Sequence, residues 1–262
     1  MILRGSVFSR ILEMETGITV ITPQDYQTDE PYKVAYLLHG LCGNSGNWAD
    51  YTMLPAHALD CRAVFVMPEA GRSFYADMKY GQRFFSYVAD ELPLICKRTF
   101  NVSAAREDTA VMGVSMGGYG ALKVALSRPE QFGSCCAFSS ACLYLREQIR
   151  GMNMLGDLDA MREYIGEQLI RDFQAILGDG FETKPEDQIL DLAADAGAGR
   201  RTRIYSACGA GDDLRGDNRR FRDDMLRLGY DFTYEEWVGG HDWIFFDAAL
   251  KKALGWWLGA EK

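Results

Sequence analysis

The sequence has few of the residues that mark metal centres and disulfide-rich folds. It contains only three histidines, and its seven cysteines include no Cys-x-x-Cys or comparable ligand spacing. We therefore expect no bound metal. An odd number of cysteines, most of them in apolar segments, is typical of free, buried thiols in a reducing compartment.

Long apolar runs are also missing. The first residues, MILRGSVFSRILEMETG, have no apolar stretch of signal-peptide length and no small-residue cleavage site. No run approaches the roughly 18 apolar residues that a membrane-spanning helix needs. Together with the free thiols, these features predict a cytoplasmic protein with no membrane partner.

Basic residues are outnumbered by acidic ones. The chain has 28 Lys and Arg against 37 Asp and Glu, for a formal net charge of −9 at pH 7. Nucleic acids and anionic membranes are recognised by basic surfaces, so we expect neither as a partner. Internal repeats, low-complexity segments and a Pro/Ser-rich linker are absent too. A chain of 262 residues, 48% hydrophobic and 25% charged, suits one domain over residues 1–262.

Short apolar runs alternate with helical patterns along most of the chain. Residues 6–22 resemble an antiparallel hairpin with its turn at Glu15-Thr16-Gly17. The later runs are mostly too continuous for strands exposed on one face, and they predict a sheet covered on both faces; they are 32–40, 61–70, 108–115, 133–140, 202–209 and 231–240. Helices are predicted near residues 81–99, 117–127, 217–228 and 243–258. This order implies a mostly parallel α/β sheet with the hairpin at its edge and the active site at the carboxyl ends of the strands.

Residues 142–200 interrupt this alternation. The segment has no good strand, and its apolar residues recur at steps of three and four, as in amphipathic helices; they are Leu155, Leu158, Met161, Ile165, Leu169, Phe173 and Ile176. We predict a helical cap inserted beside the active-site edge, with a turn near Gly178-Asp179-Gly180. Extra helical packing without a role at the site is the alternative.

The stretch GVSMGG places Ser115 between a predicted strand and a predicted helix. Gly-x-Ser-x-Gly alone is a weak signal, but this context is the one that a nucleophilic serine requires. A serine on such a sharp turn projects its hydroxyl from the sheet, and its neighbours two residues away must lack side chains. Gly113 and Gly117 meet that requirement. A glycine-rich turn with an incidental serine is the alternative.

A serine hydroxyl needs a base within hydrogen-bond reach. His57 lies mid-helix in MLPAHALD, where a structural or solvated role is expected, and His39 ends a strand. His241 follows the last strand in VGGHDW, in a loop that two glycines leave free to place the imidazole. We assign the base to His241.

The loop after the next-to-last strand, CGAGDDLRGDN, offers three carboxylates that could orient the base. Choosing Asp212 gives the chain order nucleophile, acid, base that α/β-hydrolases share. Asp213 remains open from spacing alone, and we expect Asp217 to cap the following helix.

An acyl-transfer site also needs donors for the oxyanion of the tetrahedral intermediate. One is the N–H of Met116, the residue after the nucleophile. The other should come from the glycine-rich loop HGLCGNSGNW, and we choose the N–H of Leu41. A plain strand-to-helix connection is the alternative for this loop.

Five stretches together resemble one known family: LLHGLCGNSGNW, SFYADMKYG, GVSMGGYGAL, CGAGDDL and GGHDW. They are similar to the esterase D-like, or tributyrin esterase, branch of the α/β-hydrolases, which includes feruloyl esterases, acetyl esterases, S-formylglutathione hydrolases and, more distantly, mycolyltransferases. The resemblance covers roughly residues 33–257 apart from the cap. It implies an α/β-hydrolase fold, a triad of Ser115, Asp212 and His241, and oxyanion donors at Leu41 and Met116. It also implies that Tyr75 lines the substrate pocket.

The chain departs from this family in one place, because Gly211 stands where relatives often carry a glutamate before the acid. The doubled aspartate that follows keeps Asp213 open beside Asp212.

These features predict a serine carboxylic ester hydrolase that acts through an acyl-enzyme on a small-molecule ester and needs no cofactor. Short acyl groups (acetyl, butyryl) and aryl groups of the feruloyl type suit the aromatic residues expected near the site, Tyr75 and Trp243 among them, although such residues are often core. An S-formylglutathione thioesterase and an acyltransferase with the same triad are the alternatives. The sequence leaves the oligomeric state open, a homo-oligomer included.

Overall fold

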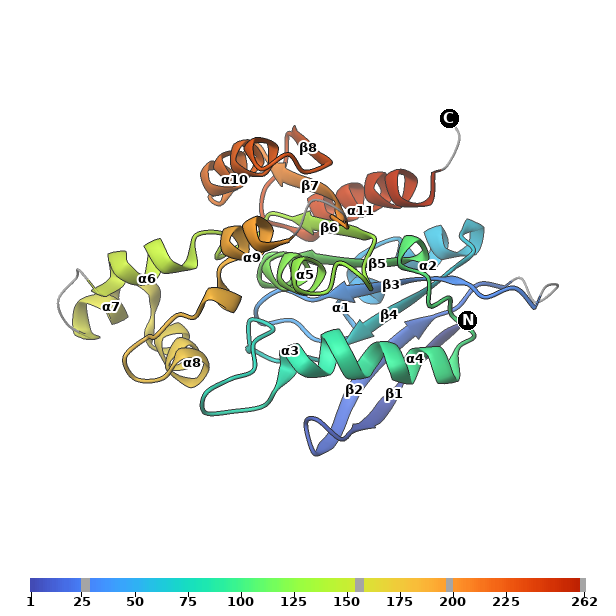
Figure 1. Cartoon of the computed structure of the whole chain (residues 1–262), viewed down its shortest axis with the longest axis horizontal. Coiled ribbons are helices and arrows are strands. Elements are labelled where there is room, and N and C mark those ends of the chain that lie inside the picture. Colours follow the sequence, from blue (N-terminus) through green and yellow to red (C-terminus); the bar gives the residue numbers. More distant parts are fainter. Residues whose placement is uncertain (25–28, 154–157, 197–199, 260–262) are drawn as a thin grey trace.

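The computed structural model describes residues 1–24, 29–153, 158–196 and 200–259. Its described strands form one eight-stranded sheet in the order β1-β2-β4-β3-β5-β6-β7-β8 (Figure 1). The first two strands pair antiparallel, β2 joins β4 antiparallel, and every other neighbouring pair is parallel. The strands are β1 (Ile2–Ser9), β2 (Met14–Ile21), β3 (Lys33–Leu38), β4 (Ala63–Pro68), β5 (Thr109–Val114), β6 (Ser134–Phe138), β7 (Arg203–Gly209) and β8 (Phe232–Trp237). The prediction of a mostly parallel α/β sheet with an antiparallel hairpin at its edge is confirmed.

Both faces of the central sheet are buried, as the continuous apolar runs predicted. Successive residues of a strand point to opposite faces, and in β3 the side chains of Val34 and Tyr36 join one core cluster while those of Ala35 and Leu37 join the other. The helices that contribute to the first cluster include α4 (Leu92–Thr99), α5 (Met116–Ser127) and α10 (Arg215–Arg227). Those of the second are α1 (Asn47–Tyr51), α2 (Leu54–His57) and α11 (Trp243–Leu258).

Between β6 and β7, the regular elements of the described residues are helices. They are α6 (Leu145–Asn153), α7 (Leu158–Ile165), α8 (Glu167–Leu177), a 3₁₀ turn η4 (Pro185–Asp187) and α9 (Ile189–Asp195). Figure 1 shows α6, α7 and α8 grouped at one end of the molecule. Leu155 of the predicted apolar pattern lies outside the described residues. The division of the chain into one domain with a cap at 142–200 stays a prediction.

The predicted position of the hairpin turn is wrong. Ser9 pairs with Met14, so the turn spans residues 10–13, and Gly17 lies inside β2 opposite Ser6. The glycine there serves close packing, because a Cβ at Gly17 would lie 3.2 Å from the Ser45 hydroxyl oxygen.

The helix predicted at 81–99 is three segments. It begins with α3 (Phe84–Ser86), widens into a π-helical turn η2 (Tyr87–Glu91) and continues as α4. Pro93 lacks the N–H that an α-helix would donate to the carbonyl of Ala89. The Gln131 side chain donates to that carbonyl instead, at 3.0 Å. Two short 3₁₀ turns, η1 (Ala58–Asp60) and η3 (Arg106–Asp108), each precede a strand.

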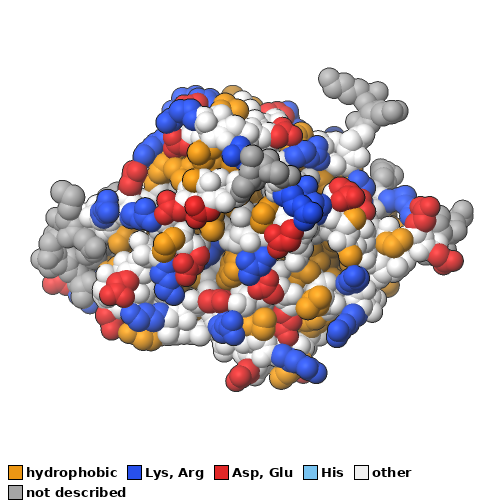
Figure 2. All heavy atoms as spheres, viewed as in Figure 1, with side chains coloured by type: hydrophobic (Ala, Val, Ile, Leu, Met, Phe, Trp, Pro, Cys, Tyr) orange, Lys and Arg blue, Asp and Glu red, His pale blue; other side chains and the backbone are white. Residues whose placement is uncertain are grey.

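The surface mixes charges of both signs. On the face shown in Figure 2, Lys and Arg are interspersed with Asp and Glu among the described residues, and neither sign forms a field of its own. Among the described helices, none combines the length and apolar character that crossing a bilayer requires. All seven cysteines are free thiols; four are buried and Cys42 is exposed.

Candidate active site

Ser115 sits between the last residue of β5 and the first residue of α5, on a strained backbone. Its φ is 57° and its ψ is −118°, a backbone conformation that residues other than glycine rarely adopt. A Cβ at Gly113 would lie 2.0 Å from the Gly117 carbonyl oxygen, and one at Gly117 would lie 2.3 Å from that of Leu38. Both positions therefore need glycine, because a side chain at either one would collide with main chain. The N–H of Ser115 donates to the Phe138 carbonyl of β6 at 2.9 Å, which anchors the turn to the sheet.

Asp212 and His241 lie in contact at the carboxyl ends of β7 and β8. His241 Nδ1 is 2.8 Å from Asp212 Oδ2, and Asp212 Oδ1 accepts the Leu214 N–H at 2.9 Å. The edge of the imidazole packs perpendicular to the Phe246 ring, with centroids 5.3 Å apart. The aspartate side chain is 1% exposed and the histidine side chain 39%, so the acid is shielded while the base faces outward.

The electrostatics of Asp212 favour its ionised form. Burial alone would raise the pKa of this carboxyl, but hydrogen bonds from His241, from the Ser139 hydroxyl and from the Leu214 N–H outweigh it and lower the pKa below the usual value. The neighbouring carboxylates occupy other positions. Asp213 is exposed, and Asp217 accepts a hydrogen bond from Gln148 at 3.2 Å.

The prediction that Asp217 caps α10 is wrong. The N-cap of this helix is Leu214, without a side-chain cap, and Asp217 lies within the first turn. The negative charge of Asp217 is still stabilised there by the positive, N-terminal end of the helix dipole.

Leu41 and Met116, the predicted oxyanion donors, both line a cavity that Ser115 also lines. Met116 is the first residue of α5, and Leu41 follows β3 in the loop whose Gly43 N–H bonds the Gly40 carbonyl at 3.0 Å. Within the described chain, neither the Leu41 nor the Met116 N–H has a hydrogen-bond partner. Both N–H groups are thus free to bind a ligand oxygen, and their role as oxyanion donors stays a prediction.

A buried network supports the Leu41 loop, and the sequence did not reveal it. The Tyr75 hydroxyl donates to the His39 carbonyl at 2.9 Å, and the His39 ring lies 2.8 Å from the Gly40 carbonyl and 3.2 Å from Glu69. Burial would raise the pKa of Glu69, but hydrogen bonds from His39, the Gly71 N–H and the Ser45 N–H lower it to about 2. The carboxylate therefore stays charged and holds the turn after β4 against the loop.

Of the two aromatic residues predicted to line the substrate site, Trp243 lines a cavity at Ser115 and Tyr75 does not. Tyr75 is fully buried, and its hydroxyl donates to the His39 carbonyl at the start of the Leu41 loop. Its neighbour Phe74 lines a cavity at Ser115. Trp243 does line a cavity with Ser115 and His241, and it packs against Trp48 with ring centroids 5.4 Å apart.

Two cavities meet at Ser115. One, of about 690 Å³, is mostly apolar; besides Ser115 and Met116, its walls include Phe74, Leu145, Leu169 and Phe173. The other, of about 320 Å³, lies on the side of the imidazole; its walls include Asn44, Asn47, Tyr51, His241 and Trp243. The serine thus stands between an apolar chamber and a smaller, more polar one. In the described residues we find no cluster of side chains that could hold a metal ion.

The chain is similar to known esterases and serine hydrolases over almost its whole length. A family model described as putative esterase matches residues 9–257. An acetyl esterase of Caldicellulosiruptor saccharolyticus is 29% identical over 269 residues, which cover 97% of each chain. A substrate-bound fluorophosphonate-binding serine hydrolase F of Staphylococcus aureus superposes with a TM-score of 0.84 at 26% identity, over 98% of each chain. An S-formylglutathione hydrolase from the same organism gives 0.81 at 26% identity, over 98% of each chain.

The family match covers the sheet from the end of β1 to the last turn of α11, and the two superposed structures share the fold over 98% of each chain. The chain belongs to the esterase family of α/β-hydrolases, and it is a serine esterase.

Proposed function

We propose that Ser115, His241 and Asp212 form the catalytic triad of this esterase. The observation that carries the proposal is the contact between His241 Nδ1 and the buried Asp212 carboxylate. His241 also lines the same cavity as Ser115, whose backbone is strained. Asp212 would keep a proton on Nδ1, which leaves Nε2 free to accept the proton of the serine hydroxyl. The chain order is that of α/β-hydrolases.

The reaction would run in two steps. Ser115 Oγ attacks the ester carbonyl while His241 takes its proton, and the carbonyl oxygen becomes an anion held by the N–H groups of Leu41 and Met116. The C–O bond to the alcohol then breaks, and the alcohol leaves with the proton from His241. Water repeats the sequence on the acyl-enzyme and releases the carboxylic acid. None of these steps calls for a metal or a cofactor.

The two cavities suggest how the ester lies. The leaving oxygen must approach His241 to receive its proton, so the alcohol would occupy the smaller cavity beside Trp243. The acyl group would then point into the apolar cavity of about 690 Å³, which can hold butyryl and feruloyl-type groups as well as acetyl.

The test is hydrolysis of p-nitrophenyl acetate by Ser115→Ala. We expect kcat to fall by orders of magnitude, up to about 10⁶-fold as in another serine hydrolase that lost its nucleophile. An unchanged circular dichroism spectrum must accompany the loss. Near-native turnover by a folded Ser115→Ala protein would rule out the assignment.

A thioesterase is the second candidate, supported by the S-formylglutathione hydrolase that is 26% identical to this chain. Thioesters and esters pass through the same acyl-enzyme, so the triad does not distinguish them. The ratio of kcat/KM for S-formylglutathione to that for p-nitrophenyl acetate decides between the two.

A further inference from the structure

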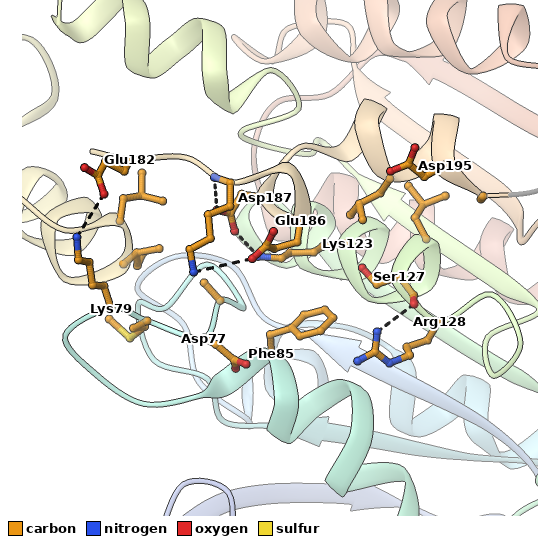
Figure 3. A pocket seen from close by; sticks show the side chains of 18 of the residues that line it. Asp77, Lys79, Phe85, Lys123, Ser127, Arg128, Glu182, Glu186, Asp187 and Asp195 are labelled. Atoms are coloured by element: carbon orange, nitrogen blue, oxygen red, sulfur yellow. Dashed lines mark hydrogen bonds and ion pairs between the residues drawn. The ribbon is translucent and has the colours of Figure 1, made fainter. Parts of the chain in front are cut away.

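A separate cavity of about 820 Å³ lies away from Ser115 (Figure 3). Its walls come from the carboxyl-terminal half of α5 and the two residues after it, the loop at residues 76–79, α3, the end of α8, the segment that leads into η4, η4 itself, and the end of α9. Neither Ser115 nor His241 belongs to these walls. The catalytic chemistry proposed above makes no use of it.

Lys123 gives this cavity a buried hydrogen-bond donor. The residue is 3% exposed, and its ammonium donates to Asp187 Oδ1 at 2.8 Å, with the Phe85 ring centroid 5.5 Å away. An ammonium has three N–H donors, and Asp187 Oδ1 is the one acceptor that the described residues supply. Because buried donors are normally satisfied, a ligand oxygen facing Lys123 would be favoured. The charge of Asp187 balances that of Lys123, so this oxygen need not be anionic.

Two further ion pairs have both partners in the cavity walls, whereas the wall residues Asp77 and Arg128 pair with residues outside the walls. Lys79 lies 3.4 Å from Glu182 (Figure 3), and Lys184 lies 3.8 Å from Glu186. Such pairs offer donors and acceptors side by side, and hydrogen bonds to charged groups are stronger than those between neutral groups. Between them the walls are apolar and include Met78, Phe85, Ile176 and Leu192.

A ligand that suits these walls is neutral, carries several hydroxyl groups and has apolar C–H faces. A hydroxyl can accept from an ammonium and donate to a carboxylate at once. We propose that this cavity is a binding site for a neutral saccharide. Its volume lies within the range of small-molecule sites.

The cavity and the apolar chamber at Ser115 have no wall residue in common, but α8 and the loop at residues 74–79 contribute residues to both. The loop that follows Phe74 is tied to α8 by the Lys79 N–H bond to the Ile176 carbonyl at 3.0 Å. Phe74 also packs against Phe173 of α8, with centroids 5.1 Å apart, and both rings line the chamber. A saccharide between loop and helix would therefore change KM for bulky acyl esters more than kcat.

Calorimetric titration tests the proposal on the whole protein after Ser115 is blocked with a fluorophosphonate. D-glucose, D-xylose and cellobiose are the neutral probes, and D-glucosamine and D-glucuronate keep the glucose ring but add a charge. We expect saturable binding of at least one neutral sugar, and at least tenfold weaker binding of the two charged analogues than of glucose. Binding of the charged analogues alone, or of no sugar at all, would overturn it. The assay measures no turnover, so its failure leaves the triad untouched.

A matched pair of variants locates the bound sugar. Ala196→Trp puts a large ring at the wall of the cavity, just after the end of α9, while Ala194→Trp alters an exposed residue of α9 outside the walls. We expect Ala196→Trp to weaken binding at least tenfold and Ala194→Trp to leave it unchanged. Equal binding by the two variants would place the sugar elsewhere and refute the site.

Discussion

Replacing Asp212 with asparagine turns one carboxylate oxygen into an NH2 donor and removes the negative charge, with almost no change in volume. In the wild-type protein Oδ2 lies 2.8 Å from His241 Nδ1, and Oδ1 accepts the Leu214 N–H at 2.9 Å. Asparagine can keep the second bond and turn its amide N–H toward Nδ1. The imidazole would then carry its proton on Nε2, where it could no longer accept the proton of the Ser115 hydroxyl.

The size of the effect follows from how enclosed this carboxylate is. Its side chain is 1% exposed, so water has little access to take its place beside the imidazole. The same exchange in a serine protease, with the geometry intact, lowers kcat about 10⁴-fold. At about 1.36 kcal/mol per factor of ten, that is roughly 5 kcal/mol of transition-state stabilisation. We expect a loss of this order for Asp212→Asn.

The assay is kcat for p-nitrophenyl acetate at neutral pH, with thermal unfolding as a check on the fold. Asp213→Asn is the matched control, because Asp213 is exposed and adjacent in sequence. It should retain kcat within about twofold, as surface substitutions away from special contacts usually do. If Asp213→Asn loses activity and Asp212→Asn keeps it, the assignment of the acid is refuted.

Three further substitutions test the supporting structure. The pKa of Glu69 is about 2 in the folded chain against 4.5 unperturbed, so its charge stabilises the fold above about pH 4.5, and up to about 3 kcal/mol of unfolding free energy is lost as the pH falls toward 2. In urea unfolding, Glu69→Gln should lose less unfolding free energy than the wild-type protein over that pH interval. An equal loss in the two proteins would contradict the network. Gly117→Ala, whose Cβ would lie 2.3 Å from the Leu38 carbonyl oxygen, should cost about 1–3 kcal/mol in the same assay, whereas Gly216→Ala, with open space at its Cβ, should be neutral or stabilising. Leu169→Trp narrows the apolar chamber and should raise KM for p-nitrophenyl butyrate more than for the acetate; an unchanged ratio would place the acyl group elsewhere.

Local patterns predicted much of this fold. The apolar runs gave the strands because residues buried on both faces leave little room for polar alternation, as the two clusters on either side of β3 show. The hairpin turn was misplaced because Leu12, in the turn, is apolar and buried, whereas Gly17, which looked like a turn residue, packs inside β2. A single sequence does not distinguish a glycine for a turn from a glycine for close packing.

In the site, too, local patterns predicted some residues and missed contacts between residues far apart in the sequence. Ser115, Asp212 and His241 could be chosen because each follows a strand, and the carboxyl ends of parallel strands share one edge. The buried network that supports the Leu41 loop could not be predicted in this way. The Tyr75 hydroxyl donates to the carbonyl of His39, 36 positions away, and no local sequence pattern indicates such a contact. Lys123 reads as an ordinary solvated helix lysine in ALKVALS, although it is buried beside an aspartate 64 positions further on.

The most direct test of the central claim is to identify the residue that carries the acyl group. The protein is mixed with p-nitrophenyl acetate, quenched in acid within the first turnover, digested and mapped by mass spectrometry. The account predicts one acetyl group on the peptide that contains Ser115, a matching burst of p-nitrophenol, and neither in Ser115→Ala. Acetylation of another residue that keeps pace with turnover, with Ser115 unmodified, would contradict it.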